Sequence, residues 1–214
     1  MAENRHCVIT LSRQMGSGGT YLGYLLAKQL GFKYVDREIV RQAAQALKTD
    51  VDSISDLDGR SSGLLSNLLR AFAVGTPEAP NLYPLRQPIY DKDLFTLESR
   101  IMNNIAEKNN AVLIGRGSFY ALKGRPGVAH IFAHAPLDFR IQRYMKVQDM
   151  TDSKRARAEI EESDARRAKF IKDMTGLNWT NSLNYHLCLD MSKVSFEASL
   201  KIVMELVKTS RLPE

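Results

Sequence analysis

The chain divides into short, continuous apolar runs and longer segments in which apolar side chains recur every three or four residues. A continuous apolar run is typical of a parallel strand covered on both faces, and the helical spacing predicts amphipathic helices. The runs that predict strands are residues 7–13, 32–36, 111–114, 128–135 and 185–190. The segments that predict helices are residues 20–31, 37–48, 91–108, 136–149, 153–174 and 195–208. This alternation predicts an α/β fold with a parallel five-stranded sheet and helices on both faces.

Residues 49–91 interrupt this alternation. The segment contains Asp-Gly and Ser-Ser-Gly turns and four prolines, with one stretch of helical pattern at residues 64–74. Long segments without periodicity in a compact domain are usually functional or mobile. We therefore expect a single domain over residues 1–214, in which residues 49–91 form an insertion that covers a ligand. A long surface excursion without such a role is the alternative.

Composition places the chain among ordinary globular proteins. Of its 214 residues, 44% are hydrophobic and 25% are charged, which is close to average usage. No apolar stretch approaches the roughly 18 residues of a membrane span, and residues 1–6 lead directly into a predicted strand rather than a signal peptide. We expect a cytoplasmic protein without a membrane partner, in which Cys7 and Cys188 are buried free thiols rather than a disulfide.

The junction between the first predicted strand and the first predicted helix is rich in glycine. Residues 13–20 read Arg-Gln-Met-Gly-Ser-Gly-Gly-Thr, which matches part of the phosphate-binding pattern G-x-x-x-x-G-K-[ST]. Gly18 and Thr20 match the second glycine and the hydroxyl that contacts Mg²⁺. Arg13 replaces the first glycine, and Gly19 replaces the lysine. Backbone N–H groups at such a turn and at a helix N-terminus face an anion; the alternative is a glycine-rich turn that binds nothing.

Arginine follows three of the five predicted strands. Ligands of open parallel sheets bind at the carboxyl ends of the strands, and arginine forks match phosphate oxygens. Arg116 is flanked by two glycines, which either lets it reach into a cleft or leaves it solvated in a turn. Asp36 and Arg41 are close enough in the predicted helix to face one ligand, but a helix N-cap is an equal alternative for Asp36. The arginines at the strand ends are Arg13, Arg37 and Arg116.

Positive charge is concentrated in the second half of the chain. The formal net charge is +6, and residues 140–172 contain ten Lys or Arg against six Asp or Glu, a local excess of +4. The helix at residues 153–174 is either solvated and stabilised by i,i+4 ion pairs, or part of a lid at residues 150–175 whose arginines close on phosphate groups. Because aromatic residues do not alternate with these charges, a small polyphosphate ligand fits better than nucleic acid.

Four stretches of the sequence resemble the cytidylate kinase-like family. They are Ile-Thr-Leu-Ser-Arg-Gln-Met-Gly-Ser-Gly-Gly-Thr at residues 9–20, Leu-Gly-Phe-Lys-Tyr-Val-Asp-Arg-Glu at 30–38, Val-Leu-Ile-Gly-Arg-Gly at 112–117 and Trp-Thr-Asn-Ser-Leu-Asn-Tyr-His-Leu at 179–187. The resemblance covers most of the chain and is weakest at residues 49–91. It implies the P-loop NTPase-type fold of nucleoside monophosphate kinases, with a helical lid and with ATP and Mg²⁺ as cofactors.

The resemblance also implies roles for individual residues. ATP is expected at Gly16, Ser17, Gly18, Gly19 and Thr20, with Mg²⁺ at the Thr20 hydroxyl. The acceptor monophosphate is expected near Asp36, Arg37, Arg41 and Arg116. Transferring charge is expected to be stabilised by Arg166, with its neighbour Arg167. From its proximity to the loop alone, Arg13 is a candidate to restore the charge that is missing at Gly19.

Together, these features favour a kinase that moves the γ-phosphoryl group of ATP to a nucleoside monophosphate, with CMP or dCMP as the first candidates. The chain departs from well-characterised cytidylate kinases at Gly19, where they have lysine, and at Ile114 and Gly117, where they have acidic residues near the arginine. A non-catalytic nucleotide-binding or regulatory module is the main alternative. A kinase for another small acceptor, bound by residues 49–91, is the next, and a nucleic-acid-binding protein is the last.

Overall fold

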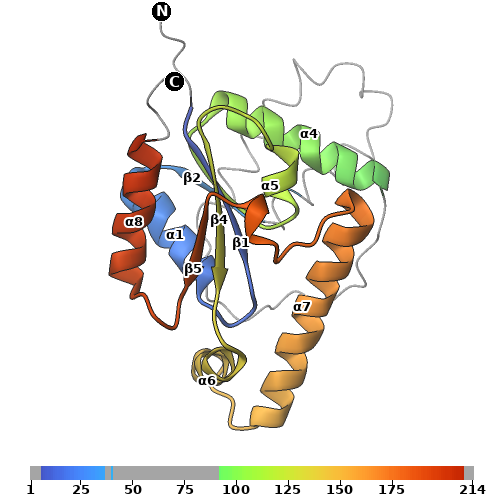
Figure 1. Cartoon of the computed structure of the whole chain (residues 1–214), viewed down its shortest axis with the longest axis vertical. Coiled ribbons are helices and arrows are strands. Elements are labelled where there is room, and N and C mark those ends of the chain that lie inside the picture. The colour runs from blue at the N-terminus through green and yellow to red at the C-terminus, as the bar shows by residue number, and fades with distance from the viewer. Residues whose placement is uncertain (1–5, 37–39, 41–91, 210–214) are drawn as a thin grey trace, which may run out of the picture.

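The computed structural model describes residues 6–36, 40 and 92–209, which are built around one parallel β-sheet (Figure 1). Its strands are β1 (Val8–Arg13), β2 (Lys33–Val35), β3 (Ala111–Ile114), β4 (Val128–His134) and β5 (Leu187–Asp190). The spatial order is β2-β3-β1-β4-β5, and each neighbouring pair is parallel. The predicted α/β fold with a parallel five-stranded sheet is therefore confirmed.

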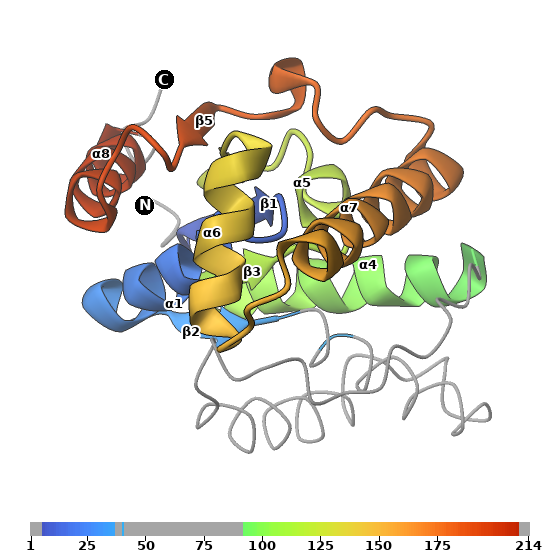
Figure 2. The same ribbon diagram turned by 90° about the horizontal axis from the view of Figure 1, so that it is seen from below.

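Helices cover both faces of this sheet, as predicted. Helices α1 and α8 lie on one face, and α4 and α5 lie on the other (Figures 1 and 2). Helix α6 and the start of α7 lie beyond the carboxyl ends of the strands. The helices are α1 (Gly19–Leu30), α4 (Lys92–Lys108), α5 (Ser118–Ala121), α6 (Leu137–Val147), α7 (Ser153–Thr175) and α8 (Phe196–Thr209), with a 3-10 helix η2 (Ser182–Asn184) before β5.

Adjacent side chains of β1 point into two separate apolar layers. Ile9 packs in one layer with Leu22 of α1 and Val203 of α8. Val8 packs in the other layer with Ile105 of α4. Each of these side chains is 0% exposed, and full burial of one such side chain contributes roughly 1.5–3 kcal/mol. A register slip of one residue would exchange the two layers, so this burial fixes the strand register.

The central strand β1 extends beyond one of its two neighbours. Its pairing with β4 continues to Arg13 opposite Ala133, whereas its pairing with β3 ends at Leu11 opposite Ile114. The last residues of β1 therefore lie beside the turn that follows β3. Because β3 and β4 lie on opposite sides of β1, this is also the kind of position at which open α/β sheets bind ligands.

Helix α7 connects the carboxyl edge of the sheet to an aromatic cluster. It begins after Asp152, whose side chain accepts hydrogen bonds from two backbone N–H groups of the first turn, and ends at Gly176, which has φ 73°. In its first half, Ile160 packs on α6. In its second half, Phe170 joins a cluster that includes Phe132 of β4. Both ends of α7 are thereby fixed relative to the sheet.

Some details of the predicted elements were wrong. The last strand begins at Leu187 rather than 185, because the buried Tyr185 donates its hydroxyl to the Trp179 carbonyl at 2.6 Å instead of continuing the strand. Helices α5 and η2 are too short to produce a periodic pattern. Both cysteines are free, as expected, but Cys188 is half-buried rather than buried. Residues 37–39 and 41–91, and with them most of the predicted helix at 37–48, lie outside the described part of the chain.

Candidate functional site

Two glycines of the loop after β1 adopt a left-handed backbone conformation. Gly16 has φ 79° and Gly18 has φ 89°, values in the left-handed region that favours glycine. Gly18 is the N-cap of α1 and provides no side chain to cap the helix, and the first turn has no acidic residue. The positive end of the helix dipole is therefore not neutralised from within α1, which is the arrangement that attracts an anion.

Side chains of the loop itself fix its shape. Ser17 is buried, and its hydroxyl donates to the Gln14 carbonyl at 2.8 Å and accepts the Gly19 N–H at 3.3 Å. The Gln14 backbone N–H donates to the carbonyl of Ala133 at 3.0 Å, and its side-chain oxygen accepts the N–H of Ala135 at 3.2 Å. The loop is thus anchored to the end of β4.

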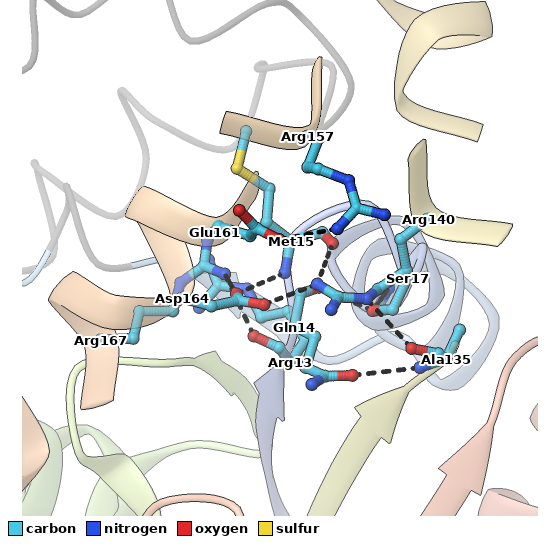
Figure 3. Close-up of polar contacts among 11 residues, drawn as sticks. Arg13, Gln14, Met15, Ser17, Ala135, Arg140, Arg157, Glu161, Asp164 and Arg167 are labelled. Atoms are coloured by element: carbon cyan, nitrogen blue, oxygen red, sulfur yellow. Dashed lines mark hydrogen bonds and ion pairs between the residues drawn. The ribbon is translucent and has the colours of Figure 1, made fainter. Parts of the chain in front are cut away.

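A carboxylate from α7 lies against this loop (Figure 3). Asp164 accepts the backbone N–H of Met15 at 2.9 Å. The same carboxylate accepts hydrogen bonds from Arg140 of α6 at 2.6 Å and from Arg167 of α7 at 3.0 Å. A negative group that receives one loop amide and two guanidinium groups has the surroundings of a bound phosphate oxygen. Asp164 therefore supplies the negative charge that these three donors face.

Both of these arginines also contact the loop backbone. Arg140 is 7% exposed and donates to the carbonyls of Ala135 at 3.0 Å and Met15 at 3.1 Å. Arg167 donates to the carbonyl of Arg13 at 3.3 Å. Guanidinium groups from two helices therefore converge on the loop, as Figure 3 shows. Of the two arginines predicted to stabilise transferring charge from α7, Arg167 is the one that the structure brings to the loop.

Arg166, the other predicted arginine of α7, makes a different contact. It pairs with Glu162 one turn away at 2.7 Å, and its side chain is 31% exposed. Similar i,i+4 pairs join Arg155 to Glu159 and Lys169 to Asp173. One side of this helix therefore carries solvated ion pairs, and another side presents Asp164 and Arg167 to the loop.

The side chain of Arg13, the last residue of β1, reaches Thr20 at the start of α1. Its Nε donates to the Thr20 hydroxyl at 3.2 Å. It also lies near Tyr34 of β2: burial raises the pKa of Tyr34 to about 12, while the charge of Arg13 lowers it and that of Asp36 raises it. Arg13 and Thr20 are thus in direct contact, and Asp36 follows β2 at the same edge of the sheet.

Arg116, at the end of β3, is engaged by a buried carboxylate. Its Nε and Nη2 lie 2.6 Å and 2.5 Å from the two oxygens of Glu98, which is 0% exposed. Its guanidinium carbon lies 4.7 Å from the centre of the Phe170 ring. Arg116 itself has φ 57° and stands between Gly115 and Gly117, which both have φ 71°. The turn therefore directs this arginine into the protein toward α4 and α7, rather than to the glycine-rich loop.

The remaining predicted and missed residues complete the site. Arg37 and Arg41 lie outside the described residues. Arg140 and Asp164, which are not among the predicted site residues, both contact the loop backbone. The sequence held one indication for Arg140. It lies four residues after Pro136, near the start of a helix that follows a central strand, and so close to the edge of the sheet where ligands bind. Asp164 precedes Arg167 by three residues, a spacing that places both on one helix face.

The described residues contain neither a cluster of metal-ligating side chains nor a membrane-spanning helix. No group of three or more His, Cys, Asp or Glu side chains in this part of the chain is arranged to hold a metal ion. Within the same residues, no helix combines the length and the apolar character needed to cross a membrane.

Comparison with known proteins agrees with this geometry. A family model described as the cytidylate kinase-like family matches residues 8–193. The chain belongs to the cytidylate kinase-like family. Membership of this family supports a kinase-like phosphotransferase that acts on nucleotides, and it confirms the resemblance carried by the loop. A search of curated proteins found no match.

Solved structures confirm the fold that the cytidylate kinase-like family implies. An uncharacterized protein from Eubacterium ventriosum ATCC 27560 is 17% identical with a TM-score of 0.69, covering 95% of this chain and 99% of its own. TT1252 from Thermus thermophilus is 15% identical with a TM-score of 0.52, covering 95% and 98%. A shikimate kinase from Bacteroides thetaiotaomicron, 14% identical with a TM-score of 0.49 and coverage of 94% and 98%, is too distant to inform the acceptor.

Proposed function

We propose that this protein transfers the γ-phosphoryl group of ATP to a nucleoside monophosphate, with CMP and dCMP as the first candidate acceptors. The observation that carries the proposal is the convergence on one glycine-rich loop of an uncapped helix N-terminus and of arginines from β1, α6 and α7. Phosphoryl transfer depends mainly on positioning and on neutralising charge. This arrangement supplies both.

The donor nucleotide is assigned to the loop. Backbone N–H groups of the loop would hold its phosphate oxygens, and left-handed glycines at positions 16 and 18 let the backbone approach them closely. The N-terminus of α1 adds a favourable dipole. The residues assigned to ATP are Gly16, Ser17, Gly18, Gly19 and Thr20. Ser17 also keeps the loop in shape through its buried hydroxyl.

The chemistry of Thr20 fits Mg²⁺. Its hydroxyl oxygen accepts one hydrogen bond from Arg13 and has a second lone pair. Mg²⁺ usually retains several waters and takes only one or two oxygens from a protein, together with substrate phosphates. Thr20 would therefore be the protein ligand, and Mg²⁺, when bound, would neutralise charge on the phosphates.

The acceptor is assigned to the edge near β2. Asp36 follows β2 at the carboxyl edge of the sheet. We include Arg37 and Arg41 from the sequence, with residues 49–91 as an acceptor-side insertion. Because Glu98 and Phe170 hold Arg116, we assign to it the positioning of the turn after β3 beside this edge, rather than direct contact with the acceptor phosphate.

In the transfer itself, an oxygen of the acceptor phosphate forms a bond to the γ-phosphorus while the bond from that phosphorus to the bridging oxygen breaks. ADP leaves, and the acceptor becomes a diphosphate. Arg140 and Arg167 already surround a carboxylate at the loop, so we assign them to the charge of the transferring group. We propose Arg167, rather than Arg166, as the arginine of the helical lid that makes this contact.

A coupled assay for ADP across a panel of nucleoside monophosphates tests the proposal. We expect ADP to accumulate with CMP or dCMP, with a large loss of turnover in the Arg167→Gln variant. The matched control is Arg155→Gln, which removes the same charge from a side chain that is 68% exposed. Absence of turnover with every monophosphate would contradict the proposed reaction.

A non-catalytic nucleotide-binding module is the second candidate. Two observations favour it: Gly19 stands where the lysine of the phosphate-binding pattern belongs, and the carboxylate of Asp164 contacts the N–H of Met15. This function predicts that ATP raises the melting temperature while ADP does not accumulate with any acceptor. The same panel, extended to small acceptors that are not nucleotides, separates the two functions from a kinase of other specificity.

A further inference from the structure

The side chain of Arg13 occupies the space beside Gly19. A Cβ atom built on Gly19 would lie 2.6 Å from the Cβ of Arg13 and 2.8 Å from the Cβ of Ala133. Both distances are shorter than real side chains allow. Gly19 is the first residue of α1 and is not one of the described glycines with positive φ. The backbone therefore does not require glycine at position 19; the neighbouring side chains do.

The far end of Arg13 lies beside Gly115 in the turn after β3, where φ 71° already favours glycine. A Cβ atom built on Gly115 would collide with Nη1 of Arg13. Between these two glycines, Nε of Arg13 donates to the Thr20 hydroxyl at 3.2 Å. The aliphatic part of Arg13 thus fills the position next to residue 19, and its charged group lies beside the residue that ends the phosphate-binding pattern.

We propose that Arg13 supplies the phosphate-directed positive charge that a lysine at position 19 supplies in loops with the full pattern, and that position 19 is glycine to make room for it. The two departures from the pattern, arginine for glycine at 13 and glycine for lysine at 19, are then a single exchange. In this chain the positive charge is carried by the last residue of β1, whereas in loops with the full pattern it is carried at the start of the helix. This inference rests on the proposed function, because it assigns a residue to the same nucleotide site.

The first arm of the test measures binding by titration calorimetry, with inorganic pyrophosphate and ATP as probes in the absence of Mg²⁺. We expect the Arg13→Gln variant to bind both probes at least about tenfold more weakly than the parent, because charge-assisted hydrogen bonds to phosphate are lost. Arg13→Lys keeps a positive charge and should retain part of the affinity. Arg155→Gln controls for the loss of net charge, since that side chain is 68% exposed.

Equal affinity of the parent and Arg13→Gln would overturn the inference and leave the proposed function intact. So would equal losses in Arg13→Gln and Arg155→Gln, because the effect would then be one of net charge. A parent protein that binds neither probe would overturn the proposed function and this assignment together.

The second arm tests the shared space through melting temperatures of Gly19→Ala, Arg13→Gly and the double variant. Alanine normally favours a helix over glycine, so a decrease in melting temperature for Gly19→Ala reports the collision. We expect Gly19→Ala to cause a clearly smaller decrease in melting temperature in the Arg13→Gly background. The contact with Ala133 is present in both backgrounds, so it does not contribute to the difference between the two decreases. The same decrease in both backgrounds would show that Arg13 does not impose glycine at position 19, and would overturn the exchange.

Discussion

Arg13 ends β1 and Arg116 lies two residues beyond the end of β3, at the same edge of the sheet, yet their guanidinium groups make different contacts. Arg13 donates to a neutral hydroxyl, that of Thr20, at the mouth of the loop. Arg116 is held by both oxygens of the fully buried Glu98 and covered by Phe170. The difference teaches that a strand end brings an arginine to this edge of the sheet, and that contacts with distant segments determine the direction in which its guanidinium group points.

The largest expected effect concerns Arg116, whose charge is paired with that of Glu98. Replacing Glu98 by Gln leaves Arg116 without its counter-charge in a buried site, and we expect the free energy of unfolding to fall by about 3–5 kcal/mol in urea denaturation. The double variant Glu98→Leu/Arg116→Met removes both charges and should recover much of this loss. A loss below about 1 kcal/mol for Glu98→Gln would mean that this ion pair behaves as an exposed one.

The next effect concerns the carboxylate at the loop. Replacing Asp164 by Asn keeps its shape but removes the charge that Arg140, Arg167 and the N–H of Met15 share. We expect a fall of about 2 kcal/mol in the free energy of unfolding. Pyrophosphate should bind more tightly, because the arginines lose an internal anion. Weaker binding would contradict the view that Asp164 and phosphate compete for the same groups.

Arg166 and Arg167 of α7 allow a second comparison, with smaller expected effects. We expect Arg167→Gln to weaken ATP binding about tenfold, or about 1.4 kcal/mol, since Arg167 contacts the loop. Arg166 pairs with Glu162 and is partly exposed, so Arg166→Gln should cost less than about twofold. Isothermal titrations with ATP measure both. Equal losses would show that the direction of each side chain does not matter.

The smallest effect concerns pH, because arginines do not titrate near neutrality. Burial, reinforced by His186, lowers the pKa of His130 to about 4, and His130 is hydrogen-bonded to Thr10 at 2.7 Å. Its pKa is therefore lower in the folded state than in the unfolded state. The stability that neutral, buried His130 contributes to the folded state is present above about pH 6.5 and is lost as the pH falls toward 4.

Linkage gives a loss of about 0.7 kcal/mol between pH 7 and pH 6 from His130. Urea denaturation at the two values measures it, and the His130→Gln variant should show a smaller change. The same change in both proteins would exclude His130 as its source.

Most of the fold could be predicted because the signals are local. The strands of a fully covered parallel sheet appear as continuous apolar runs, and the glycine-rich turn marks the position where β1 meets α1. The short helices α5 and η2 carry no periodic signal and were missed. The start of β5 was misplaced because a distant carbonyl, that of Trp179, holds Tyr185.

The site was harder to predict, because contacts between distant segments decide which charges are neutralised. The sequence correctly located Arg116 at the end of a strand but did not reveal that Glu98 reaches it from α4. One signal was present: Glu98 lies on the apolar stripe of α4 with Leu94, Met102 and Ile105, all buried. A carboxylate on such a stripe predicts a buried ionic partner. Asp164 sits among exposed charges of α7, where no comparable pattern singles it out.

The claim that nucleotide binds at the glycine-rich loop is tested most directly by amide chemical shifts of the isotope-labelled protein during titration with ATP and Mg²⁺. We predict the largest changes at the backbone amides of residues 15–20, accompanied by the side-chain Nε–H signal of Arg13. Changes confined to other parts of the chain, or no changes at saturating ATP, would contradict the account.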